Sequence, residues 1–243
     1  MKLPSIFHLS AAIVAFAPVS KAATVLSQNF DTDPMNFTLP GISNPFRIDT
    51  VDPARYWGPS NMPGVAVNPG VTGAVGIYLG AQNMNNDGDG FTLTFDTAGP
   101  NGPAEIDFTV DVTNFSDLLL SVALAGMPSV EVENYLRAFT DNDGDGFYET
   151  QLFNFLGSSN SPYIDGVLGA LSGNFATFNL TLSQPTSPDG NLRLRFEIFN
   201  DTQSQNEASG IDEILITGTP VVPEPGSAAL GLAALGLCFR RRR

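Results

Sequence analysis

Histidine, cysteine and lysine are almost absent from this chain of 243 residues. It holds a single histidine, His8, a single cysteine, Cys238, and two lysines, Lys2 and Lys21, so residues 23–225 contain none of these types. Triad hydrolases need a histidine base, zinc sites need His or Cys, and Schiff-base enzymes need lysine. The central stretch therefore excludes these three classes. It also holds no G-x-x-x-x-G-K phosphate loop and no dinucleotide fingerprint.

Positive charge of any kind is scarce in the same stretch. Five arginines stand against all 25 acidic residues of the chain, a balance of −20. Such a charge repels a polyanion, so we expect no nucleic-acid partner. The lack of cysteine also excludes a disulfide framework, so stability has to come from the core and from bound cations.

Helix-period segments are missing between the termini, and apolar residues alternate with polar ones instead. The segments 106–112 and 192–198 alternate strictly, which predicts strands with one buried face. Their predicted inward side chains are Ile106, Phe108, Val110, Val112, Leu192, Leu194, Phe196 and Ile198. Similar runs occur at 118–124, 130–139, 176–182 and 211–217. Because Gly, Pro, Asn and Asp clusters separate the runs, we expect an all-β fold, an antiparallel β-sandwich of the jelly-roll type over 23–218.

The N-terminus has the parts of a secretory signal. Lys2 is followed by an apolar run over 3–19 and then by Ser-Lys-Ala, which fits the small-x-small rule for signal peptidase. We therefore expect a signal helix over 1–22 that signal peptidase removes, which makes the protein an exported one. A buried N-terminal helix is the alternative, but Pro4 and Pro18 bracket the run and disfavour it.

The C-terminal segment has three parts. A proline-rich linker over 219–225 ends in Pro-Glu-Pro, an apolar stretch covers 226–239, and four arginines follow. The motif residues are Pro223, Glu224, Pro225, Arg240, Arg241, Arg242 and Arg243. As a helix the apolar stretch would measure about 21 Å, shorter than the ~30 Å hydrocarbon core of a bilayer. We expect a short transmembrane helix over 226–243 whose arginines stay at the cytoplasmic face.

This layout resembles the PEP-CTERM sorting signal, and the resemblance covers Val222 to Arg243. Proteins of that family are exported by Gram-negative bacteria that make extracellular polysaccharide, and their tails are thought to be processed by exosortase, a membrane enzyme. The resemblance implies an exosortase substrate of the cell envelope, cell surface or extracellular space. It also implies an inner-membrane tether that is transient or permanent, depending on whether the tail is cleaved.

An acidic segment of the predicted sandwich, 141–149, has the spacing of a calcium loop. The sequence is DNDGDGFYE, with acidic residues at alternate positions and Gly146 at the turn. The predicted ligands of a structural Ca²⁺ are Asp141, Asp143, Asp145, Glu149 and the carbonyl oxygen of Phe147. The bidentate glutamate of an EF-hand is replaced by Leu152, so Glu149 or water has to complete the shell. A bare Asp-Gly hairpin turn is the alternative.

A second segment, 85–91, repeats the start of this loop as NNDGDGF. Its ligand candidates are Asn85, Asp87 and Asp89. Because Asn85 stands where the first loop has Asp141, one carboxylate fewer attracts a cation. The sequence leaves open whether this loop binds one.

The predicted strands loosely resemble lectin-like jelly-roll and galactose-binding-like sandwiches. The resemblance rests on a central hairpin, ENYLRAFTDNDGDGFYETQLFNF, and on a closing strand, GIDEILITG. It implies sugar binding through aromatic and polar side chains, for which the candidates are Tyr56, Trp57, Tyr135 and Arg137. For Trp57 a structural role, capping the core, is the alternative.

These observations together indicate a non-catalytic protein of the cell surface or extracellular matrix, with a calcium-stabilised β-sandwich that adheres to polysaccharide. A dedicated carbohydrate-binding module is the alternative, and a glycosidase that uses two carboxylates is the third hypothesis. The carboxylate candidates for the third are Glu131, Glu133, Glu197 and Glu213. Glu131 and Glu133 alternate with valines, which favours a solvated strand face over a site.

Overall fold

The computed structural model describes residues 21–30, 47–48, 56–60, 71, 74, 78–82, 103–128, 130–159, 161–200 and 208–221. Every regular element in these ranges is a β-strand. The described residues form no helix that is long and apolar enough to cross a membrane. Residues 1–20 of the predicted signal helix, the C-terminal helix with its sorting residues, and the second loop with Asn85, Asp87 and Asp89 lie outside the described residues.

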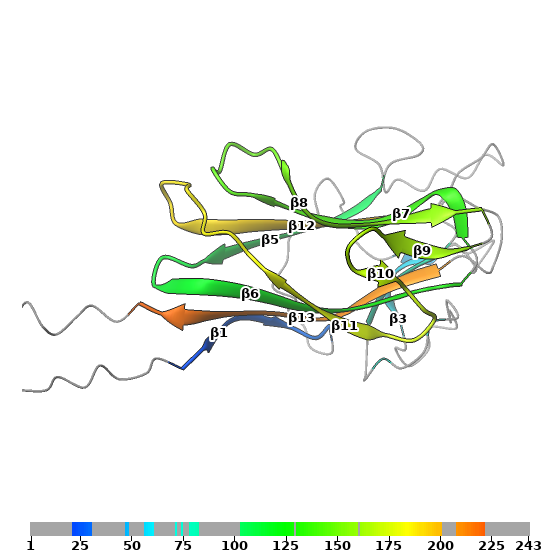
Figure 1. Ribbon diagram of the computed structural model, residues 1–243, viewed down its shortest axis with the longest axis horizontal. Coiled ribbons are helices and arrows are strands. Elements are labelled where there is room, and N and C mark those ends of the chain that lie inside the picture. Colours follow the sequence, from blue (N-terminus) through cyan, green and yellow to red (C-terminus); the bar gives the residue numbers. More distant parts are fainter. Residues whose placement is uncertain are drawn as a thin grey trace, which may run out of the picture.

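The strands form two antiparallel sheets, which Figure 1 shows as two layers. One sheet is seven-stranded, with the order β11-β6-β13-β4-β3-β2 and with β1 paired to β13. Its strands are β1 (Ala23–Gln28), β2 (Arg47–Ile48), β3 (Tyr56–Ser60), β4 (Tyr78–Gln82), β6 (Phe115–Gly126), β11 (Ala176–Thr181) and β13 (Ala208–Pro220). The other is six-stranded, with the order β10-β9-β8-β7-β12-β5. Its strands are β5 (Ala104–Asp111), β7 (Val130–Asp141), β8 (Thr150–Ser158), β9 (Ser161–Asp165), β10 (Gly169–Ala170) and β12 (Asn191–Phe199).

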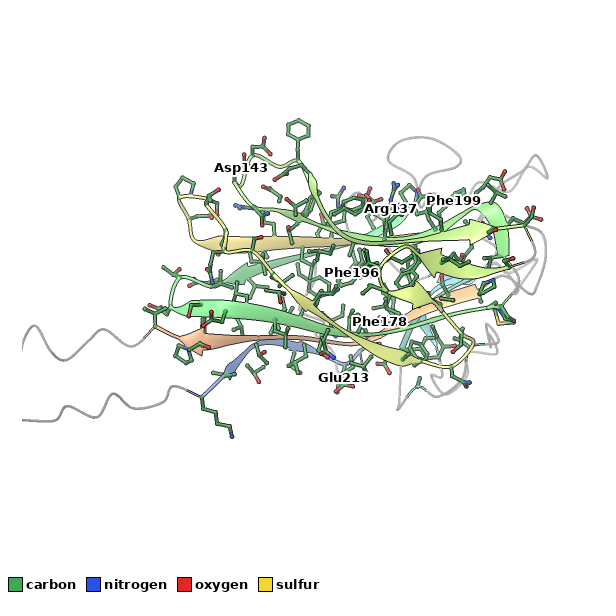
Figure 2. The ribbon with its side chains drawn as sticks, viewed as in Figure 1. Arg137, Asp143, Phe178, Phe196, Phe199 and Glu213 are labelled. Atoms are coloured by element: carbon green, nitrogen blue, oxygen red, sulfur yellow. The ribbon has the colours of Figure 1, made fainter. Side chains whose placement is uncertain are left out.

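The hydrophobic core lies between the two layers. All eight inward side chains predicted from the alternation of 106–112 and 192–198 are buried there. Phe155 of β8 and Phe178 of β11 link the sheets, with ring centroids 5.4 Å apart, and Figure 2 shows Phe178 and Phe196 between the layers. The predicted all-β fold of antiparallel sheets is therefore confirmed for the described residues.

β7 departs from regular pairing with β8 just before Tyr135. A Cβ on Gly157 of β8 would lie 1.7 Å from the carbonyl oxygen of Glu131, so only glycine lets β7 pass this close. Beyond the irregularity, Tyr135 and Arg137 point to the outer face, because Leu136 between them is buried in the core.

β13 extends beyond the strand that the sequence pattern predicts at 211–217. Thr219 and Pro220 still pair with Ser116 and Phe115 of β6. The sheet thus extends two residues into the segment 219–225, for which a linker is predicted. Proline is tolerated here because its nitrogen faces away from β6, and the next N–H, that of Val221, still donates to the carbonyl oxygen of Asn114 at 2.8 Å.

Candidate functional site

The acidic loop, residues 141–149, joins β7 to β8. It brings the carboxylates of Asp141, Asp143, Asp145 and Glu149 together, with one oxygen of each within 4.8 Å of the others. Asp141 is buried and the other three are exposed, and Figure 2 shows Asp143 projecting beyond the six-stranded sheet. Clustered carboxylate oxygens are the ligands that a hard divalent cation takes in proteins. The four predicted acidic ligands therefore do lie side by side.

Backbone N–H groups hold the acidic loop in this shape. The two carboxylate oxygens of Asp141 accept hydrogen bonds from the N–H groups of Gly144 and Gly146, at 2.6 and 3.0 Å. Oδ1 of Asp143 accepts one from the N–H of Asp145 at 3.2 Å. Gly144 and Gly146 have φ angles of 81° and 94°, in the left-handed region that glycine adopts without steric cost. The two glycines thus turn the backbone so that the aspartates converge.

The acidic loop rests on the segment between β11 and β12. The carbonyl oxygen of Asn142 accepts hydrogen bonds from the backbone N–H groups of Thr186 and Ser187, at 2.7 and 3.0 Å. Nδ2 of Asn142 donates to the hydroxyl of Thr150 at 3.0 Å. A change in the shape of the loop is therefore transmitted to its neighbours.

One guanidinium lies next to the acidic loop. Arg193 of β12 is the register partner of Asp141, and a Cβ on Gly144 would lie 2.7 Å from its Nη1. Its Nη2 pairs with Asp189 at 2.5 Å. Hydrogen bonds, first from the backbone N–H of Asn191 and also from Arg193, lower the pKa of Asp189. Arg193 offsets part of the negative charge that a cation would meet in the loop.

A row of apolar side chains crosses the outer face of the six-stranded sheet. Ile164 of β9 pairs with Leu156 of β8, which also pairs with Tyr135 of β7. Tyr135 in turn pairs with Phe199 of β12, and their rings stack with centroids 5.4 Å apart. Leu156 and Ile164 are 45% and 47% exposed, Tyr135 is half-buried, and Phe199 is buried at 8% exposure, so it backs the ring of Tyr135. We call these four residues the apolar strip, and Figure 2 shows Phe199 on the outer side of its layer.

A row of polar side chains lies directly beside the apolar strip, and we call it the polar row. Its members are Asn154, Arg137, Glu197 and Glu105, register partners in this order across β8, β7, β12 and β5. Nε of Arg137 donates to Glu197 at 2.5 Å. Oδ1 of Asn154 is buried and has no hydrogen-bond partner in the part of the chain that the structure describes. The row thus sets donors and acceptors beside an apolar surface.

A second arginine extends the charged surface along β12. Arg195 donates to Asp107 through Nε and Nη2, at 2.7 and 2.8 Å, and its Nη1 pairs with Glu105 at 2.9 Å. Its Cζ lies 4.3 Å from the centroid of the Tyr148 ring. Burial alone would lower the pKa of Arg195. The hydrogen bonds to Asp107 and the charge of Asp107 outweigh burial, so the pKa of Arg195 is raised. Burial also raises the pKa of Tyr148 to about 12, so neither group titrates near neutral pH.

Two of the four predicted sugar-binding residues lie together on this face. Tyr135 belongs to the apolar strip and Arg137 to the polar row. Tyr56 and Trp57 belong to β3 of the seven-stranded sheet, so the four candidates do not share one sheet. Sequence analysis did not single out Phe199, although continued alternation beyond 192–198 places it on the outer face. An apolar residue at an outward position was the signal that could have found it.

The glutamates considered for glycoside hydrolysis are spread over the molecule. Glu131 and Glu133 are exposed on β7, and Glu213 is exposed on the opposite sheet (Figure 2). Glu197 is largely buried and faces Glu105 across the strands. Burial raises the pKa of Glu105, although the charge of Arg195 opposes the shift. Among the described strands, Glu197 is the candidate whose register partner, Glu105, also carries a carboxyl group.

No protein-family model and no curated protein match this chain. Solved structures are distantly similar to it. The K3 cleaved adhesin domain of Lys-gingipain from Porphyromonas gingivalis has a TM-score of 0.44 and 13% identity, covering 81% of this chain and 99% of that chain. The CBM22-1 xylan-binding domain of Xyn10C from Paenibacillus barcinonensis has a TM-score of 0.41 and 11% identity, covering 84% and 99%. An apo cyclase from Fischerella has a TM-score of 0.39 and 13% identity, covering 83% and 98%. Because these scores are low, the similarity says nothing about what this chain binds.

Proposed function

We propose that this protein is an exported, non-catalytic surface protein whose β-sandwich binds an uncharged polysaccharide across the apolar strip and the polar row. The observation that carries the proposal is the strand register, which sets an apolar row beside a hydrogen-bonding row on one face. A sugar ring needs both kinds of partner, because it has an apolar C–H face and a rim of hydroxyls. A dedicated carbohydrate-binding face is thereby preferred to a matrix protein that only adheres to polysaccharide.

The apolar strip runs across the strands, which bears on the size of the ligand. Neighbouring strands lie about 4.8 Å apart, so the accessible part of the strip spans roughly 10 Å from Ile164 to Tyr135. A glycan lying along it would meet a side chain at each strand, which suits several linked sugars better than a monosaccharide. The polar row runs parallel, and its partly exposed members Arg137 and Glu105 can hydrogen-bond to the same sugars.

The charges near the strip favour an uncharged glycan. Arg137 and Arg195 are both paired with carboxylates, and the whole chain has a formal net charge of −14. An anionic polysaccharide would therefore meet net repulsion and guanidinium groups that are already engaged.

Export would place this binding face outside the inner membrane. We infer that signal peptidase removes residues 1–22 and that Val222 to Arg243 acts as a PEP-CTERM signal for exosortase, with a transient or permanent tether. The support is the sequence pattern of these two segments. Mass spectrometry of the native protein is expected to find an N-terminus near Ala23 and no arginine cluster. A chain that retains Arg240 to Arg243 would contradict processing, though not tethering.

Calcium in the acidic loop would stabilise the sandwich. The proposed ligands are Asp141, Asp143, Asp145, Glu149 and the carbonyl oxygen of Phe147. Three aspartates within five residues repel one another, and a bound cation turns that repulsion into attraction. Since Asn142 ties the loop to the segment between β11 and β12, the stabilisation would extend beyond the hairpin itself.

Binding of the full chain to a panel of uncharged and acidic polysaccharides tests the proposal. Wild type is expected to bind one or more uncharged polymers and no acidic one. The double variant Leu156→Thr with Ile164→Thr should bind about fivefold more weakly or worse, because it removes two exposed apolar side chains worth about 1 kcal/mol or more together. Ser121→Ala, on the outer face of the other sheet, is the matched control and should bind as wild type does. If no uncharged polymer binds, or if the double variant retains full affinity, the proposed site is wrong.

Glu105 and Glu197 favour a second candidate, a glycosidase acting at the same face. They are register partners, and burial raises the pKa of Glu105 against the charge of Arg195. Two neighbouring carboxyl groups, one of which has a raised pKa, are an arrangement used in glycoside hydrolysis. Release of reducing sugars that is abolished by Glu105→Gln and by Glu197→Gln would establish the enzyme. Binding without release favours the non-catalytic protein.

A further inference from the structure

The two sheets end in edge strands of different chemistry. β5 ends the six-stranded sheet and β11 ends the seven-stranded sheet. The outward side chains of β5 include Glu105, Asp107 and Asp111, whereas β11, with the sequence ATFNLT, holds no charged residue, proline or glycine. Charge on an edge strand hinders its pairing with another chain, and β11 is without this protection.

β11 directs half of its backbone hydrogen-bonding groups away from β6. The N–H of Leu182, the residue after β11, donates to the carbonyl oxygen of Leu118 at 2.9 Å. Because bonded and non-bonded residues alternate in an antiparallel pair, the backbone groups of Thr177, Asn179 and Thr181 face away from β6. Within the described ranges, no strand pairs with this side of β11.

The sequence of β11 is self-complementary in an antiparallel pair centred on Asn179. In that register Thr177 faces Thr181 of a second copy, and Phe178 faces Leu180 of the second copy. The two Asn179 side chains face each other and can hydrogen-bond through their amides. Thr–Thr and aromatic–aliphatic pairs are favourable across strands. The outward backbone groups also oppose one another in this register, so about six backbone hydrogen bonds can form.

The partial exposure of two apolar side chains on β11 favours the same register. Phe178 and Leu180 pack against the core but remain only partly buried. A second copy paired along β11 would cover each of them from the side with an apolar residue. The pairing would thus continue the core across the interface as well as the backbone ladder.

The distribution of charge also favours β11 as the place where two copies pair. At a formal net charge of −14, two copies repel each other and can associate only where their charges stay apart. β11 is uncharged, and its outward neighbours on β6 include Ser121 and Ala123. The polar row belongs to the other sheet, and the acidic loop meets the segment after β11 at Thr186 and Ser187, beyond the proposed pairing. The edge of β11 is therefore a place where close approach brings few carboxylates together.

We propose that two copies of this chain pair along β11 about a two-fold axis and join their seven-stranded sheets into one continuous sheet. This dimer would leave both apolar strips exposed, because the strips belong to the six-stranded sheets. Two strips on one particle can engage the same long polymer, which raises the apparent affinity by avidity. The dimer itself does not depend on glycan binding.

Sedimentation velocity of the full chain in mild detergent, over a series of concentrations and at low and high sodium chloride, tests the dimer. Wild type is expected to dimerise, and more strongly at high salt, because salt screens the repulsion between acidic copies. Asn179→Lys sets two lysines against each other at the axis and should weaken dimerisation more than about tenfold. Thr24→Lys adds the same charge at an exposed position on β1, away from β11, and should dimerise as wild type does.

A charge swap completes the experiment. Asn179→Lys and Asn179→Asp are each expected to sediment as monomers, whereas their mixture should form a heterodimer, since lysine then faces aspartate. Formation of the heterodimer would also show that both variants are folded. Three results would each overturn the proposal: a wild type that stays monomeric at every concentration and salt, an Asn179→Lys variant that dimerises as Thr24→Lys does, or a mixture that stays monomeric.

Discussion

The guanidinium carbon of Arg137 lies 4.1 Å from the centroid of the Tyr135 ring, two residues away on the same strand. The same guanidinium donates from Nε to Glu197 on the neighbouring strand. Aromatic ring, cation and carboxylate thus hold one another in place on the outer face. Through this contact the apolar strip and the polar row form one surface.

Replacing Arg137 by methionine is expected to destabilise the fold by about 1.5–3 kcal/mol, because Glu197 loses the donor of a charge-assisted hydrogen bond. The carboxylate is the more buried partner, with side-chain exposures of 11% for Glu197 and 33% for Arg137. Adding Glu197→Gln to Arg137→Met should restore part of the loss, since the buried position then carries no charge. Urea unfolding measures both steps. A double variant less stable than Arg137→Met would contradict this explanation.

Calcium is expected to raise the thermal midpoint of the wild type but not that of a variant carrying Asp143→Asn and Asp145→Asn. An ion that binds only the folded state adds RT ln(1 + [Ca]/Kd), about 2.7 kcal/mol at a hundredfold excess over Kd. Sodium chloride of equal ionic strength should not reproduce the gain. Calorimetry with EDTA, with calcium and with matched salt makes the comparison. An equal rise in both proteins would mean that the acidic loop is only a hairpin turn.

Gly144 and Gly146 allow a matched pair of alanine substitutions in the acidic loop. Both have positive φ angles, so alanine at either position costs about 1–2 kcal/mol of backbone strain. At Gly144 the new Cβ would also lie 2.7 Å from Nη1 of Arg193 and 2.9 Å from Cβ of Ser187, whereas nothing lies within 4 Å at Gly146. Gly144→Ala should therefore destabilise more than Gly146→Ala in urea unfolding. The reverse order would argue against the packing of the loop on Arg193.

Asp165, at the end of β9, should give stability a defined pH dependence. Its carboxylate accepts hydrogen bonds from the backbone N–H groups of Asn154, Val167 and Leu168, at 2.7, 2.7 and 2.8 Å. Burial alone would raise its pKa, but these donors outweigh burial and lower it. A lowered pKa in the folded state means that Asp165 stabilises the fold above the unfolded value of about 3.9 and stops doing so as the pH falls through the folded value.

The free energy of unfolding of wild type should accordingly exceed that of Asp165→Ala by about 1–3 kcal/mol at pH 7, because three N–H groups lose their acceptor. The difference should stay constant down to about pH 4 and shrink below it. Urea unfolding at a series of pH values tests the sign. A difference that grows on acidification would contradict the assignment.

Side-chain direction within a strand could be predicted from the sequence. The alternation of 192–198 put Phe196 in the core, where it is buried, and it also fixed Arg195 and Glu197 on the outer face. The prediction succeeds because side-chain direction in a strand repeats every two residues and depends on no other part of the chain. The convergence of the aspartates in the acidic loop is equally local, since nine consecutive residues contain all of them.

Neighbours across strands could not be predicted in this way. Arg137 and Glu197 are 60 residues apart in the sequence and form an ion pair because β7 lies beside β12. Strand order and register depend on the packing of the whole core, and periodicity within one strand contains no information about them. For the same reason the sequence grouped Trp57 with Tyr135, although their strands belong to different sheets.

Glycan binding at the apolar strip is tested most directly by an amide chemical-shift titration of the isotope-labelled protein with an oligosaccharide of the polymer it binds. The largest shift changes are expected at Tyr135, Leu156 and Ile164 and on the adjoining polar row, with Ser121 of the opposite sheet and Asp143 of the acidic loop unchanged. Changes confined to the acidic loop or to the seven-stranded sheet would contradict binding at the strip.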